Sequence, residues 1–273
     1  MSNYIHVTIH VTDQFVKDLV VAHLFDKGFE GVEEQPEELN AFIKQDDFNE
    51  SEVKDVLDSY KLPYAVTIVA SQNWNALWES NFEPVVIEDF CMIRADFHEK
   101  DEALPLDIII TPKMSFGTGH HATTYMMVEQ MSHLLFENKK VADFGTGTGI
   151  LAIVAEKLGA IRIVAIDVDD YSIENSVENI GRNNCYKIEV IQSNLFSSAE
   201  QFDIILANIN KNVIVDNIQA LAAALNAGGN VLLSGLLKED EYDILMACQA
   251  YNLRRVNTVE RNNWISILLE HSI

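Results

Sequence analysis

The first seventy residues alternate apolar and polar positions in the manner of a small α+β domain. Residues 4–10 alternate with period two, which is typical of a half-buried strand. The predicted elements are a strand over 4–10, a helix over 13–24, strands over 29–33 and 39–44, a helix over 50–60 and a strand over 65–69. The order β-α-β-β-α-β predicts a ferredoxin-like fold for residues 1–70.

Residues 71–103 form a connecting region with weaker patterning. Trp74 and Trp78 are four residues apart, so a helix would place both on one face, where packing explains them better than function. Short apolar runs at 85–87 and 92–95 predict two strands.

From residue 104 to 273 the pattern changes to strands that alternate with helices. The predicted strands cover 140–144, 161–166, 187–192, 202–207, 229–234, 254–259 and 264–270, and the helices cover 150–158, 171–182, 213–225 and 238–250. Repeated βα units predict an α/β fold, a Rossmann-like, doubly wound parallel sheet with helices on both faces.

Charge and cysteine content narrow the classes of protein. The chain has 273 residues and a formal net charge of −23, which argues against a nucleic-acid binder and favours a basic partner or simple solubility. The three cysteines form no C-x-x-C pair, so neither a disulfide framework nor a cysteine-rich zinc site is expected. With no signal-peptide pattern and no apolar run near the ~20 residues that span a bilayer, we expect a soluble cytoplasmic protein away from membranes.

The strongest local motif is a glycine loop between a predicted strand and a predicted helix. Gly145, Gly147 and Gly149 have the spacing G-x-G-x-G, which differs from the dinucleotide pattern G-x-G-x-x-G because Ile150 occupies its last position. The loop therefore favours an adenosyl ligand. Asp167 ends the next strand, 22 residues after Gly145, where a carboxylate can accept hydrogen bonds from ribose hydroxyls. The alternative role is that of an acid at a helix N-terminus, which Asp169 or Asp170 fits better.

Two further segments carry candidate site residues. Asn208 follows a strand at the edge where ligands bind, and its amide oxygen can accept from an amine; a turn or N-cap role is the alternative and fits Asn210 better. The glycine-bearing loop over 112–124 could fold over a ligand as a lid with its glycines as pivots, or it could be an ordinary surface loop. No metal site is expected, because the adjacent His120 and His121 point apart.

Together these motifs resemble the ribosomal protein L-eleven methyltransferase family, class I enzymes that use S-adenosylmethionine. The segments that carry the resemblance are 114–124, 143–151, 167–169, 207–209 and 233–237. It implies a substrate-recognition domain over 1–70, a linker over 71–103 and a catalytic domain over 104–273. The implied activity is methylation of lysine ε-amines, with an N-terminal α-amine as a further acceptor, on a basic large-subunit ribosomal protein, protein eleven.

The resemblance also implies roles for single residues. The implied cofactor contacts are Thr124, Gly145, Gly147, Gly149, Asp167, Asn208, Phe116, Gly117 and Gly119. Asn208 would also orient the amine. The sequence departs from the family pattern at His120, Ala122, Thr146, Thr148 and Asn210.

Two other classes of protein are compatible with the sequence. A small-molecule methyltransferase with the same core would not need residues 1–70. A nucleotide-binding oxidoreductase or a nucleotide sensor is disfavoured by the G-x-G-x-G spacing. A monomer is expected, with no direct contact to nucleic acid.

Overall fold

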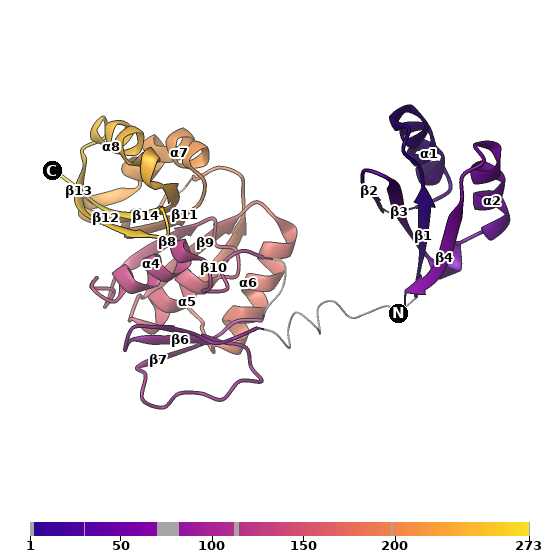
Figure 1. Ribbon diagram of the computed structural model, residues 1–273. Coiled ribbons are helices and arrows are strands. Elements are labelled where there is room, and N and C mark those ends of the chain that lie inside the picture. The colour runs from indigo at the N-terminus through magenta and orange to yellow at the C-terminus, as the bar shows by residue number, and fades with distance from the viewer. Residues whose placement is uncertain (1–2, 30, 70–81, 112–114, 198, 273) are drawn as a thin grey trace. The chain divides into compact units, whose positions relative to one another are not determined.

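The chain forms two compact units, Met1–Leu77 and Trp78–Ile273, in the computed structural model (Figure 1). The structure describes residues 3–29, 31–69, 82–111, 115–197 and 199–272. The predicted helix with Trp74 and Trp78 lies outside the described residues.

The first unit is an antiparallel sheet with two helices. Its elements are β1 (Tyr4–His10), α1 (Gln14–Asp26), β2 (Gly31–Glu34), β3 (Glu38–Lys44), a 3-10 turn (Gln45–Asp47), α2 (Glu50–Ser59) and β4 (Tyr64–Val69). The strand order is β2-β3-β1-β4, and β1 pairs antiparallel with both β3 and β4. The predicted ferredoxin-like fold is confirmed.

Alternation along β1 builds the core of this unit. Ile5, Val7 and Ile9 are buried, whereas the residues between them lie on the opposite face. The buried side chains share one hydrophobic cluster with Val20 and Leu24 of α1, and with α2. Both helices therefore cover one face of the sheet.

The second unit is built around a seven-stranded sheet. Its elements are β5 (Val85–Ile87), β6 (Cys91–Arg94), β7 (Leu106–Ile109), α4 (Ala122–Met131), β8 (Lys140–Phe144), α5 (Ile150–Lys157), β9 (Arg162–Asp167), α6 (Asp170–Arg182), β10 (Ile188–Gln192), β11 (Phe202–Asn208), α7 (Lys211–Ala223), β12 (Leu225–Leu237), a 3-10 turn (Lys238–Asp240), α8 (Glu241–Gln249), β13 (Leu253–Arg261) and β14 (Trp264–His271). The strand order in the large sheet is β10-β9-β8-β11-β12-β14-β13.

The sheet is mixed rather than wholly parallel, which corrects the sequence expectation at one edge. The neighbouring strands β10, β9, β8, β11 and β12 run parallel to one another, but β14 is antiparallel to both β12 and β13. The two-residue connection between β13 and β14 explains this: Asn262 and Asn263 have φ of 53° and 65°. Positive φ at both central residues is the geometry of a tight β-hairpin turn, which reverses the chain.

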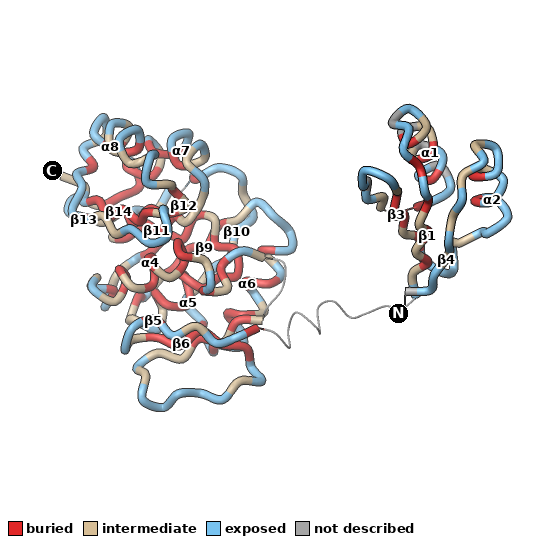
Figure 2. The backbone as a smooth tube through the Cα atoms, viewed as in Figure 1, coloured by how far each residue is buried: buried red, intermediate tan, exposed pale blue. Residues whose placement is uncertain are grey.

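Helices cover both faces of the large sheet. One hydrophobic cluster joins α4, α5 and α6 to the sheet, and a second joins α7 and α8 to it. Figure 2 shows the buried segments running through the centre of this unit, along β9, β11 and α5. The doubly wound arrangement is confirmed.

A small three-stranded sheet adds to the second unit. Strands β5 and β6, predicted within the connecting region, form a sheet with β7 and pack into the same cluster as α4 and α5. Arg94 is 8% exposed and donates to both carboxylate oxygens of Asp107, at 2.6 and 2.8 Å. Among the described residues no helix is both long and apolar enough to cross a membrane.

Candidate cofactor and acceptor site

A cavity of about 460 Å³ opens at the carboxyl ends of the parallel strands. Phe144, Asp167 and Asn208 come from the ends of β8, β9 and β11, which are neighbours in the sheet. This edge, where the strand order reverses, is where doubly wound sheets bind ligands. The volume is within the range of small-molecule and cofactor sites.

The glycine loop contributes to the wall of the cavity. Gly145 and Gly147 line it, with φ of 79° and 55°. A Cβ on Gly147 would lie 2.3 Å from the carbonyl oxygen of Phe116, so a larger residue cannot take its place without moving backbone. The sequence motif thus reflects close approach between two chain segments as well as a tight turn.

Asp167 is held in place by backbone amides. One carboxylate oxygen accepts from the amide of Gly147 at 2.8 Å, and the other accepts from the amides of Val168 and Asp169 at 2.8 and 3.1 Å. Asp167 lines the cavity and is partly exposed. A fixed carboxylate with remaining acceptor capacity suits the paired hydroxyls of a ribose. Asp169 instead caps α6, as its alternative role predicts.

Asn208 lines the cavity and carries a buried neutral acceptor. Its amide nitrogen donates to the hydroxyl of Thr124 at 3.4 Å, and among the described residues no donor reaches its buried Oδ1. A buried amide oxygen without a donor costs about 1–3 kcal/mol, which a bound N–H group recovers. The unpartnered atom therefore fits a ligand that carries an amine.

Asp143 lies beneath the loop, away from solvent. It is fully buried and accepts from the hydroxyl of Thr146 at 2.6 Å. Burial raises the pKa of Asp143 to about 7, although the hydrogen bond from Thr146 lowers it. The negative charge of Asp167 also raises the pKa of Asp143, so burial and this charge both favour the protonated, uncharged carboxyl.

Three aromatic rings contact one another in a row that begins at the cavity wall. Phe116 lines the cavity and contacts the His121 ring, whose centroid is 5.2 Å away, and His121 contacts Trp264 at 4.8 Å. His121 is also the N-cap of α4, where its Nδ1 accepts from the amide of Thr123 at 3.3 Å. Burial lowers the pKa of His121, which favours the neutral ring.

The structure brings together only part of the predicted site at the cavity wall. Phe116, Gly145, Gly147, Asp167 and Asn208 line it. The other four predicted residues are not among the lining residues: Thr124, Gly117, Gly119 and Gly149. Thr124 is fully buried and reaches the cavity through Asn208.

Several residues that line the cavity were not predicted from the sequence. They are Phe144, Val168, Ser172, Ser193, Asn194, Ile209, Asn210 and Val213. Position alone was the available signal, since most follow the ends of β9, β10 and β11. The side chain of Asn210 caps α7 by accepting from the amide of Val213 at 3.1 Å, as its alternative role predicts. Among the described residues no group of His, Cys, Asp and Glu has the arrangement of a metal site.

The sheet order, the glycine loop and the acid at the end of β9 define a class I methyltransferase that depends on S-adenosylmethionine. The family model for ribosomal protein L11 methyltransferase (PrmA) matches residues 6–272. The chain therefore belongs to this family, which confirms the resemblance seen in the sequence.

Individual relatives agree with the family match. The ribosomal protein L11 methyltransferase of Porphyromonas gingivalis is 38% identical over 270 residues, which is 96% of this chain and 93% of that protein. That of Phocaeicola vulgatus is 35% identical, over 97% and 98% of the two chains. The crystal structure of ribosomal protein L11 methylase from Lactobacillus delbrueckii subsp. bulgaricus superposes with a TM-score of 0.65 at 28% identity, covering 70% of this chain and 100% of that one.

Proposed function

We propose that this enzyme transfers methyl groups from S-adenosylmethionine to amines of ribosomal protein L11, with lysine ε-amines as the main acceptors and the N-terminal α-amine as a second. The relatives named for that substrate match along almost the whole chain, including the first unit. The observation that carries the proposal is the buried, unpartnered Oδ1 of Asn208 beside the cofactor cavity.

The strand register suggests how the cofactor lies. Ala207 pairs with Phe144, and Phe144 pairs with Ile166, so Asn208 and Asp167 lie at one level on either side of Gly145. Two strand spacings separate them by about 10 Å. In the proposed arrangement, Asp167 accepts from the ribose, and the methionine end with its sulfonium methyl lies toward Asn208.

The remaining predicted residues have supporting roles in this arrangement. Thr124 holds Asn208 through the 3.4 Å hydrogen bond, and Gly117 and Gly119 belong to the segment that carries Phe116. Gly149 begins α5 in a left-handed conformation. When bound, the cofactor supplies the electrophilic methyl group.

A neutral acceptor suits the chemistry of an amine nucleophile. A lysine of pKa ~10.4 costs about 4.6 kcal/mol to deprotonate at pH 7, whereas an α-amine costs only about 1 kcal/mol. A carboxylate beside the amine would raise that cost. Asn208 can orient the amine without doing so, and positioning would then supply most of the acceleration. We propose no dedicated general base.

Substitution of Asn208 tests its role directly. Asn208→Ala should lower kcat at saturating cofactor by tenfold or more, because an oriented acceptor for the amine is lost. Asn208→Asp, of the same shape, should shift the kcat profile to higher pH, since its charge raises the pKa of the amine. Full turnover by Asn208→Ala at saturating cofactor would show that another group orients the amine.

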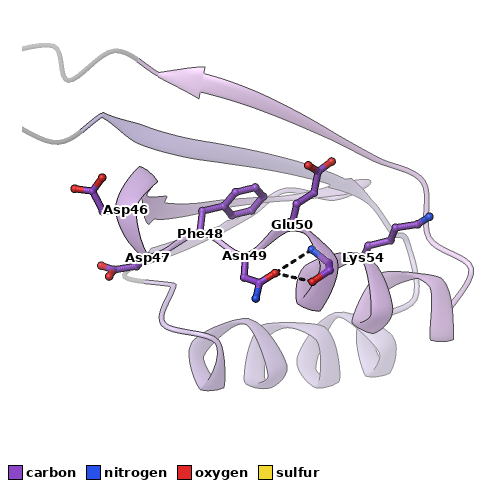
Figure 3. A pocket seen from close by; sticks show the side chains of 7 residues that line it. Asp46, Asp47, Phe48, Asn49, Glu50 and Lys54 are labelled. Atoms are coloured by element: carbon purple, nitrogen blue, oxygen red, sulfur yellow. Dashed lines mark hydrogen bonds between the residues drawn. The ribbon is translucent and has the colours of Figure 1, made fainter.

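The first unit has the charge expected of a domain that captures a basic protein. Glu33, Glu37, Asp46 and Asp47 are exposed there. Figure 3 shows Asp46, Asp47 and Glu50 around a groove at the start of α2, where the side chain of Asn49 caps the helix. Among the described residues that line this groove, Lys54 is the only cation. Such a surface attracts cationic partners at low ionic strength.

Salt dependence tests this capture. Association with the ribosomal protein should weaken between low and physiological salt, and charge reversal by Glu33→Lys with Asp47→Lys should weaken it further. The matched control is Glu174→Lys with Asp216→Lys, which changes the net charge equally on two exposed positions of the second unit. Salt-insensitive association, or equal losses in both double variants, would count against the role of the first unit.

The substrate is tested with radiolabelled cofactor and purified large-subunit ribosomal proteins resolved by mass. Label in a single band at protein L11 supports the proposal. Removal of residues 1–70 should abolish labelling while cofactor binding stays intact, whereas a small-molecule methyltransferase would retain turnover of its metabolite. We further propose that the enzyme is cytoplasmic and monomeric, which fractionation and sedimentation would test.

A further inference from the structure

One buried residue links two segments that lie at the cofactor cavity. The hydroxyl of Thr148, in the glycine loop, donates to the carbonyl of Gly117 at 2.7 Å. The amide of Thr148 donates to the carbonyl of Phe116 at 2.9 Å. Thr148 itself is 0% exposed, whereas Phe116 is 52% exposed and lines the cavity.

The two segments pack closely against each other at this junction. Gly117 has φ of 105°, and a Cβ there would lie 2.7 Å from the Thr148 hydroxyl oxygen. A Cβ on Gly147 would lie 2.3 Å from the carbonyl oxygen of Phe116. These two glycines therefore allow close packing between the segments.

A third element, helix α6, is hydrogen-bonded to Thr148. The side-chain nitrogen of Asn179, on α6, donates to the carbonyl of Thr148 at 2.9 Å. The side-chain oxygen of Asn179 accepts from the amide of Thr111 at 2.8 Å. Asn179 is also 0% exposed, so Thr148 is fixed on both sides by hydrogen bonds shielded from water.

We propose that Thr148 is a positioning residue that holds residues 115–121 against the glycine loop and so fixes Phe116 at the cavity wall. The proposal rests on the cofactor placement proposed above. Without the hydroxyl, the carbonyl of Gly117 loses its donor and the segment can leave the wall. Only the fraction of molecules with the segment in place then binds cofactor well, which weakens the apparent affinity in proportion.

Two substitutions of Thr148 separate the hydroxyl from the shape. Thr148→Val keeps the volume and removes the donor, whereas Thr148→Ser keeps the donor. By calorimetry, Thr148→Val should bind S-adenosylmethionine about tenfold more weakly, since a buried carbonyl left without its donor is costly. Thr148→Ser should stay within about twofold of the wild type. Thr118→Val is the matched control, because it removes a hydroxyl from the same segment that bonds neither Gly117 nor the glycine loop.

Amide hydrogen exchange supplies a readout that a general loss of stability would not give. The amide at position 148 should exchange faster in Thr148→Val than in the wild type, because its acceptor is Phe116. The amide of Gly149 bonds within the glycine loop, to Thr146 at 2.9 Å, and should stay equally slow in both. In the wild type alone, the Thr148 amide should exchange as slowly as the amides of β8.

Wild-type affinity in Thr148→Val, or an equal loss in Thr148→Ser, would overturn the proposal. Fast exchange of the Thr148 amide in the wild type would overturn it even if the valine variant did not fold. Failure of the wild type to bind cofactor would instead refute the cofactor placement, so the two failures are distinguishable.

Discussion

Asp143 makes the stability of the second unit depend on pH in a direction opposite to that of most aspartates. Burial raises its pKa from 3.8 to about 7. An acid whose pKa is raised in the folded state binds its proton more tightly when folded. Its contribution therefore favours the folded state at low pH and is lost as the pH rises from about 4 to about 7. Asp143→Asn, which keeps the shape, removes this dependence.

The size of the effect follows from the two pKa values. Between pH 5 and pH 8 the unfolded carboxyl stays ionised, while the folded one ionises only near pH 7. Linkage then gives a loss of roughly 2–3 kcal/mol in the free energy of unfolding of the wild type relative to Asp143→Asn. For a unit of this size that corresponds to about 5–10 °C in Tm.

The assay is unfolding by denaturant at pH 5, 6, 7 and 8 for both proteins without cofactor. The other titrating groups are common to both, so the difference between the two free energies isolates Asp143. Asp216→Asn removes an exposed carboxylate from the same unit and controls for net charge. Parallel curves for the wild type and Asp143→Asn across this range would refute the reasoning, because they would show that Asp143 is ionised alike in both states.

Two further predictions concern packing and burial. Gly147→Ala should weaken binding of S-adenosylmethionine more than tenfold by calorimetry, because its Cβ would meet backbone at 2.3 Å; Gly181→Ala, on an open helix surface, should leave binding unchanged and raise stability by about 0.5–1 kcal/mol. Equal affinities would contradict the close approach. The three cysteines are buried, which raises their pKa values to about 12, about 11 and about 12, so they should react with Ellman's reagent at pH 8 only after unfolding; rapid labelling of the native protein would contradict their burial.

The element order could be predicted because each element carries its own local pattern. Alternation along 4–10 and the βα units after residue 140 do not depend on distant contacts. The direction of β14 was missed because it depends on the backbone conformation at Asn262 and Asn263, which hydropathy does not report. Strand β7 was missed because its four residues form a strand only by pairing with β6.

Site residues could be predicted from the sequence only where they follow the end of a predicted strand, because that position places them at a known edge of the sheet. Asp167 and Asn208 were found because the ends of parallel strands meet at one edge. Thr148 appeared in the sequence only as a departure from a family pattern. Its contact with Gly117 joins positions 31 residues apart, and that contact depends on how the second unit folds.

The charges around the cavity are compatible with the cationic cofactor and the neutral amine of the proposed mechanism. Among the described lining residues Asp167 is the only carboxylate, and it lies about two strand spacings from Asn208, beyond the roughly 4–6 Å within which a carboxylate strongly raises the pKa of an amine. His121, whose ring contacts Phe116 at the cavity wall, is a candidate base, but its Nδ1 accepts from an amide, so the neutral ring carries its proton on Nε2. That nitrogen can donate but cannot accept. In the proposed mechanism the amine loses its proton to water before it attacks, so activity should rise with pH until the acceptor amine itself is neutral.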